Sequence, residues 1–468
     1  MASALRVPPV GRLLVLGLIS AIALAIAFSP PIAGATPKAM LALGIVAFTV
    51  GLWATSAVPH PVAAVAFFVL AFLSMAASWL SLVQGFVSSG AGLAFGGLLI
   101  GTAADRSGLG RWVARGFVSR FGGSYSRLTL GVLIGNLALG FLIPASLGRM
   151  AITIPLVAAA AKEAGYDEGS RPYVGLMLTV VVGGFVTSFG VLPANLMNIL
   201  VTSAATGSLG ITFSYGAYLL ACFPVLALAK AMLYWALSVA VFRPRGEVVS
   251  ASLKPATAER LSSAGRRLAV VLAITISLWA TDFLHGIAPG WVALAAGAAT
   301  AMPGLRLVSP KEMVDKPKVI AMLGLGAVLG LAALLTESGA GKVIAELLTR
   351  SLDLRGMPSS AAFLAIALMS SLLAAVTTMV GALSIITPSL HALSRPPGMS
   401  LEAAVYAELA GFNCLLFPYQ AVPILVGLAI SGVRYSEALR ITIPVALVSM
   451  AVILPLNAAW LRIIGLLS

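Results

Sequence analysis

Apolar residues run along this chain in stretches long enough to cross a bilayer, and short polar or basic segments separate them. A spanning helix needs roughly 20 predominantly apolar residues. The stretches lie near 13–29, 39–57, 62–80, 89–105, 128–161, 172–204, 214–242, 268–286, 289–303, 318–336, 359–393, 401–432 and 437–466. The pattern predicts an all-α polytopic membrane protein.

Four of the stretches carry polar or helix-breaking residues at their middle. Irregular backbone at membrane depth is tolerated only where it is buried in protein or lines a cavity. We therefore interpret 128–161 and 359–393 as re-entrant hairpins, whose tips we call tip 1 (144–149) and tip 2 (377–381). We interpret the other two interruptions as breaks in transmembrane helices, called break 1 (187–195) and break 2 (417–423).

The first hairpin has an alternative reading. Pro144 removes a backbone hydrogen bond and kinks a helix, so 128–161 also fits one kinked transmembrane helix. Its Arg149 is costly at membrane depth unless it faces a partner, water or a ligand. In the kinked-helix reading that partner is a neighbouring carboxylate.

Matching features recur in the two halves of the chain, about 230 residues apart, as in a duplication. The segment 105–111 resembles 336–342, Pro155 matches Pro388, and Pro193 matches Pro423. The implied organisation has an N-terminal transmembrane helix in 1–36, a first repeat in 37–242, a cytoplasmic linker in 243–267 and a second repeat in 268–468.

Charge orients the two repeats. The composition, 60% hydrophobic and 9% charged with a net charge of +14, is that of a membrane protein, and the basic residues lie between the apolar spans. They therefore favour topology signals over a nucleic-acid partner. The positive-inside rule places the N-terminus in the cytoplasm of an inner, or plasma, membrane protein. An odd number of crossings in the first repeat then inverts the second, so hairpin one opens from the cytoplasm and hairpin two from outside.

Inverted repeats with discontinuous helices are typical of secondary transporters. Half-helix N-termini carry partial positive charge and favour anions. We expect a small anionic substrate of the dicarboxylate type, with no bound cofactor or metal. The guanidinium of Arg149 matches a carboxylate or sulfate as a planar fork. The candidate substrate-binding residues are Ser146, Arg149, Asn195, Thr377, Thr378 and Gln420.

Several of these side chains have a second interpretation. Asn195, Gln420, Thr377 and Thr378 also suit hydrogen bonds to backbone that a nearby break leaves free. Lys230 lies inside an apolar span, and we expect it to snorkel to the interface or to pair.

Residues 98–161 and 183–201 resemble the divalent anion/sodium symporter family, a branch of the ion transporter superfamily that includes citrate transporters. Members carry Ser-Asn-Thr at each hairpin tip, where this chain has 145–147 and 378–380. Their Pro-Pro-Asn break resembles 193–195, and 422–424 in the second half. The resemblance implies two transport sub-bundles, a homodimer and an elevator-type motion.

The resemblance also implies a co-transported ion. The candidate ion-coupling residues are Ala145, Ser146, Val191, Met379, Gln420 and Glu408. Sodium follows from the resemblance, whereas the altered tip motifs favour a proton or a counter-anion. Glu408, if buried near the site, would carry a proton or neutralise Arg149. Arg149 would alternatively stand where a sodium ion sits in relatives.

Other functions fit less well. An arsenite or sodium/proton transporter of the same superfamily would depend strongly on an acidic residue. An integral membrane enzyme would need acids or histidines clustered at one membrane face, and the sequence has none. A channel would conduct ohmically, whereas inverted hairpins predict saturable uptake.

Overall fold

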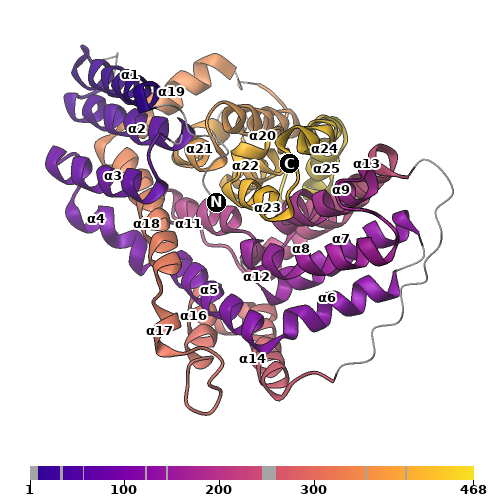
Figure 1. Ribbon diagram of the computed structural model, residues 1–468. Coiled ribbons are helices and arrows are strands. Elements are labelled where there is room, and N and C mark those ends of the chain that lie inside the picture. The colour runs from indigo at the N-terminus through magenta and orange to yellow at the C-terminus, as the bar shows by residue number, and fades with distance from the viewer. Residues whose placement is uncertain are drawn as a thin grey trace.

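The computed structural model describes residues 9–31, 35–55, 57–121, 124–143, 146–244, 260–352, 354, 356–395 and 398–468. All regular elements within these ranges are helices (Figure 1), which confirms the all-α prediction. Eight helices in the described ranges are long and apolar enough to cross a membrane, or up to nine if the bent pair Trp79–Val87 and Ser89–Ser107 forms one span.

The two halves of the chain contain similar series of elements. The first half contains α1 (Pro9–Phe28), α2 (Pro37–Thr55), α3 (His60–Ser74), α4 (Trp79–Val83), η1 (Gln84–Val87), α5 (Ser89–Ser107), α6 (Leu109–Arg120), α7 (Tyr125–Leu142), α8 (Ser146–Glu163), α9 (Arg171–Leu178), η2 (Thr179–Gly183), α10 (Gly184–Thr187), η3 (Ser188–Gly190), η4 (Leu192–Ala194), α11 (Leu196–Leu209), α12 (Tyr215–Cys222), η5 (Phe223–Ala229) and α13 (Lys230–Phe242). The second contains α14 (Ser263–Ala280), α15 (Asp282–His285), α16 (Pro289–Ala299), α17 (Pro310–Met313), α18 (Lys316–Ser338), α19 (Ala340–Leu352), α20 (Ser359–Val376), α21 (Met379–Ser394), α22 (Leu401–Asn413), η6 (Pro418–Gln420), α23 (Val422–Ser431), α24 (Tyr435–Val448), η7 (Ser449–Ile453) and α25 (Leu454–Ile463). From α5 and α18 onward the longer helices correspond in order: α6 with α19, α7 with α20, α8 with α21, α9 with α22, α11 with α23, and α12, η5 and α13 with α24, η7 and α25. The first half has the additional short elements η2, α10, η3 and η4 where the second has only η6.

Helix α5 and its counterpart α18 end in the same way. Gly108 and Gly339 both take left-handed backbone, with φ of 74° and 80°, which glycine adopts without a Cβ penalty. The hydroxyl of the preceding serine, Ser107 or Ser338, accepts a bond from the first amide of the next helix. The shared cap supports the predicted duplication, whereas its inversion across the membrane stays a prediction.

The helices pack in two groups. One contains α1 to α5 with α14, α16 and α18, and the other contains α7 to α13 with α20 to α25. Contacts between the groups run largely through α11 and α21, which pack against α18. In Figure 1 the violet N-terminal helices and the yellow C-terminal helices accordingly lie apart. The half-helices α11 and α21 therefore lie at the boundary between the groups.

At the first hairpin the structure describes the two helix ends but not Pro144 or Ala145. A Cβ placed at Gly110 would meet the δ-methyl groups of both Ile143 and Ile152, each at 2.9 Å. Side chains nine positions apart thus reach the same point on α6, which favours a chain that turns back over one that runs on. We therefore keep the interpretation of residues 128–161 as a re-entrant hairpin.

Two predicted boundaries are corrected. The span predicted over 62–80 ends at Ser74, because Met75 takes left-handed backbone with φ of 50° and α4 follows. The linker predicted over 243–267 ends before Ser263, since the Ser262 hydroxyl accepts a bond from the Gly265 amide and caps α14 there. Residues 245–259 of that linker lie outside the described residues.

Candidate functional site

Tip 1 is joined to break 1 by the Arg149 guanidinium. Arg149 Nη1 donates to the carbonyl oxygen of Ile143 at 2.8 Å and to that of Ala194 at 2.7 Å, and Nη2 donates to Ser146 Oγ at 3.3 Å. Ser146 Oγ itself donates to Ala194 at 3.4 Å. Arg149 is only 2% exposed, so its charge is held inside the protein. The carboxylate expected in the kinked-helix reading is not found among the described residues near it.

Two asparagines form hydrogen bonds across break 1. Asn195 Nδ2 donates to Ser188 Oγ at 3.1 Å, and its Oδ1 caps α11 by accepting from the Met197 amide. Asn198 Nδ2 donates to the carbonyl oxygens of Ser188 and Val191, at 3.0 and 2.9 Å. Asn195 thus satisfies backbone at the break, as the second interpretation of it required. Val191, a candidate ion-coupling residue, offers its carbonyl to Asn198.

Tip 2 is joined to break 2 through a different contact. The Tyr419 hydroxyl donates to the Ala375 carbonyl near the end of α20. Thr377 Oγ1 donates to backbone oxygens of Leu373 and Thr378, and Thr378 caps α21, which starts at Met379. Thr377 and Thr378 therefore serve the backbone of their own tip.

At break 2, the candidate residue Gln420 has a side-chain amide of which only the oxygen is hydrogen-bonded among the described residues. Its Oε1 accepts from the Phe417 amide at 2.6 Å, whereas its Nε2 is buried and has no partner among the described residues. Such an unpaired buried donor is costly and calls for a ligand or water. Gln420 therefore combines a structural bond with a free donor facing into the protein.

The two halves meet at Asn413, the last residue of α22. Its Nδ2 donates to the carbonyl oxygen of Val186, next to break 1, at 2.6 Å, and to that of Leu226 at 3.4 Å. Its own carbonyl accepts from Lys230 Nζ at 3.0 Å, and Lys230 also donates to Ser449 Oγ at 2.6 Å. Lys230 is fully buried, so of the two expectations for it the structure shows pairing, by these hydrogen bonds, and not snorkelling. Asn413 was not among the predicted residues, although an amide four residues before a break is a signal for it.

Glu408 lies on α22, fully buried. Both of its carboxylate oxygens lie 2.9 Å from Thr387 Oγ1 on α21, which donates to them. Arg149 does not contact it among the described residues, so the expected neutralisation of Arg149 by Glu408 is not found. Glu408 is therefore a buried carboxylate in the second repeat, and no cationic side chain pairs with it in the described part of the chain.

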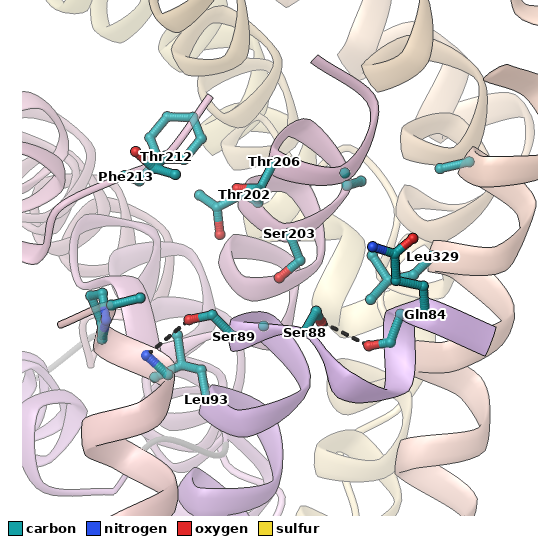
Figure 2. A pocket seen from close by; sticks show the side chains of 18 of the residues that line it. Gln84, Ser88, Ser89, Leu93, Thr202, Ser203, Thr206, Thr212, Phe213 and Leu329 are labelled. Carbon is teal, nitrogen blue, oxygen red and sulfur yellow. Dashed lines mark hydrogen bonds between the residues drawn. The ribbon is translucent and has the colours of Figure 1, made fainter. Parts of the chain in front are cut away.

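A cavity of about 410 Å³ lies beside break 1 (Figure 2). Its largely apolar wall also carries hydroxyl and amide groups from α4, from η1 and α5 with the residue between them, from α11, and from the segment before α12. They belong to Ser81, Gln84, Ser88, Ser89, Thr202, Ser203, Thr206 and Thr212. Leu192 of break 1 also lines it, so the cavity reaches the interrupted segment. These residues were not among those predicted, because they come from segments far apart in the chain.

The predicted site residues thus form two separate clusters in the structure. Ser146 and Arg149 meet break 1, whereas Thr377 and Thr378 lie at tip 2, which Tyr419 joins to the segment that holds Gln420. The connection between the groups passes through Asn413. Ala145 lies outside the described residues.

Comparison with known proteins identifies the family of this chain. The profile described as the sodium:sulfate symporter transmembrane region matches residues 11–467. A membrane protein of Cupriavidus necator is 25% identical over 492 aligned residues, covering 96% of this chain and 93% of that protein.

Two solved structures share the fold. The YdaH transporter of Alcanivorax borkumensis has a TM-score of 0.58 at 17% identity, over 84% of this chain and 89% of that one. MtrF of Neisseria gonorrhoeae, described with a class of antimetabolite efflux pumps, has a TM-score of 0.54 at 14% identity, over 98% and 96%. The profile match confirms the resemblance to the divalent anion/sodium symporters. The chain belongs to the sodium:sulfate symporter family, whose members are membrane-embedded transporters of small anions and not enzymes.

Proposed function

We propose that this chain is a secondary active transporter of a small, dicarboxylate-like anion that works by elevator-type alternating access. The observation that carries the proposal is that, in each half, the hairpin tip is hydrogen-bonded to the interrupted helix. Arg149 of tip 1 bonds to Ala194 in the first half, and in the second Tyr419 bonds to Ala375, which lies on α20 two residues before tip 2. Tip and break then move as one body in each repeat, which a carrier of bound solute requires.

An anion is favoured by the groups around the interruptions. The half-helices α8, α11, α21 and α23 begin there, and helix N-termini attract negative charge. Gln420 Nε2 is a buried donor that no group in the described part of the chain accepts from. Arg149 and Lys230 add two buried cations next to breaks 1 and 2.

The two packed groups of helices support the motion. In the proposal, the group with α1 to α5 stays fixed as a scaffold in the plasma membrane, with the N-terminus in the cytoplasm. The other group moves against it along α11 and α21, the helices at the boundary. The hydroxyl-lined cavity lies at this boundary and reaches Leu192, so it is the proposed path of the solute to break 1. The working unit would be a homodimer, as the resemblance implies.

Uptake into proteoliposomes tests the proposal. The purified chain is reconstituted, and entry of radiolabelled sulfate and succinate is followed under an imposed sodium, proton or counter-anion gradient, with empty liposomes as the control. We expect saturable uptake that one gradient accelerates. Absence of uptake of both anions under all three gradients, or current proportional to voltage, contradicts the proposal.

The buried Glu408 favours a second candidate function, arsenite transport or sodium/proton exchange. The same vesicles distinguish it. A Glu408→Gln variant keeps the contact with Thr387 but loses the charge. Exchange would then stop, whereas anion uptake driven by sodium or a counter-anion would continue.

A further inference from the structure

We propose that Arg149 is a built-in cation, occupying the place at the contact of tip 1 with break 1 where a mobile coupling cation would otherwise bind. This rests on the proposed transport function and deepens it, because it determines how many ions accompany the solute. The first repeat would then supply its positive charge from the chain and not from the medium.

The guanidinium is surrounded as a small cation would be. Its nitrogens lie 2.7, 2.8 and 3.3 Å from two backbone carbonyl oxygens and a serine hydroxyl. Ile143 is the C-cap of α7, where helix carbonyls are unpaired and carry partial negative charge. Ala194 belongs to the unwound segment of break 1. Unwound carbonyls and half-helix C-terminal ends are the groups that coordinate co-transported cations in broken-helix carriers.

A purely structural role explains this arrangement less well. Burying a charged group is costly unless it is compensated. Among the described residues the compensation for Arg149 comes from neutral oxygens and not from a carboxylate, and the side chain is 2% exposed. A neutral amide would satisfy the same carbonyls without that cost. The positive charge itself is therefore the feature to explain.

The second repeat differs at the matching position. Arg149 lies six residues before Pro155, and the residue six before Pro388 is Ala382. At tip 2 the nearby hydroxyl of Thr377 donates to backbone oxygens. No described side chain brings a cation to that tip, so the substitution is confined to the first repeat.

Binding of radioactive ²²Na⁺ to the purified full-length chain tests the inference without any transport assay. We expect Arg149→Ser, which removes the charge and leaves a hydroxyl, to bind about one more sodium ion per chain than the wild type. Arg149→Lys, which keeps a cation in the cage, should bind as the wild type does. Equal sodium binding by the wild type and Arg149→Ser overturns the inference.

Stability provides the second readout if Arg149→Ser is poorly folded. Sodium that enters the cage stabilises the folded state by mass action. The apparent Tm of Arg149→Ser should therefore rise in sodium chloride relative to choline chloride, with a smaller difference for the wild type. Equal Tm values of the variant in the two salts overturn the inference. If proteoliposome uptake fails while the extra sodium binds, the transport proposal fails and the inference about the cage stands.

Discussion

Replacing Arg149 with alanine should lower anion uptake by about 100-fold or more in sodium-free medium. The change removes the two bonds that join Ile143 and Ala194. Hydrogen bonds to charged groups contribute about 1.5–3 kcal/mol each, and about 1.4 kcal/mol corresponds to a tenfold effect. Tip 1 would lose its connection to break 1, and with it the geometry of the proposed site. Initial rates in proteoliposomes with choline as the only external cation measure this effect.

Arg106→Ala is the matched control for charge removal. Arg106 is more than half exposed and forms an ion pair with Glu312. Surface ion pairs contribute little, about 0–1 kcal/mol, so uptake should stay near the wild-type rate. If Arg149→Ala also transports at the wild-type rate in choline, Arg149 has no part in the site.

Replacing Asn413 with leucine should destabilise the whole protein. The substitution removes the donor to the carbonyl oxygens of Val186 and Leu226, which join the second half to the first. Leaving a buried polar group unpaired costs about 1–3 kcal/mol. With two such groups we expect a loss of about 2 kcal/mol or more, seen as a lower apparent Tm and a lower yield of monodisperse protein.

Asn457→Leu separates this effect from the mere loss of an asparagine. Asn457 is buried to the same degree, but neither of its side-chain polar atoms has a partner among the described residues. Replacing an unsatisfied buried polar group with an apolar one of similar size is neutral or stabilising. The apparent Tm of Asn457→Leu should therefore equal or exceed that of the wild type. Equal Tm losses in the two variants would refute the role given to Asn413.

Much of the helical framework follows from local pattern. The apolar stretch near 89–105 is α5, and Ser107-Gly108 marks its end because a glycine suits the left-handed cap. The break at 187–195 was visible because Pro193 and its polar neighbours cannot continue a membrane helix without partners. These features depend only on residues close together in the chain, so they can be predicted from the sequence.

The hydrogen-bond partners of buried side chains are harder to predict from the sequence. Lys230 reads locally as a lysine that snorkels, whereas its ammonium binds Asn413 and Ser449, about 200 residues away along the chain. The cavity wall likewise joins Ser88, Thr202 and Thr212 from separate segments. Helix packing decides such contacts, and no periodicity of one segment encodes them. The π-helical turns at η5 and η7 were also missed, since only the i→i+5 bonds distinguish them.

The inverted relation of the two repeats underlies the whole account, and labelling of single cysteines tests it most directly. Arg111 and Lys342 are both exposed and each lies three residues after an equivalent left-handed glycine, Gly108 or Gly339. The native Cys222 and Cys414 are buried and contribute little background. A membrane-impermeant maleimide should label Lys342→Cys in intact cells and Arg111→Cys only in inverted vesicles. Labelling of both cysteines from the same side would show parallel repeats and contradict the account.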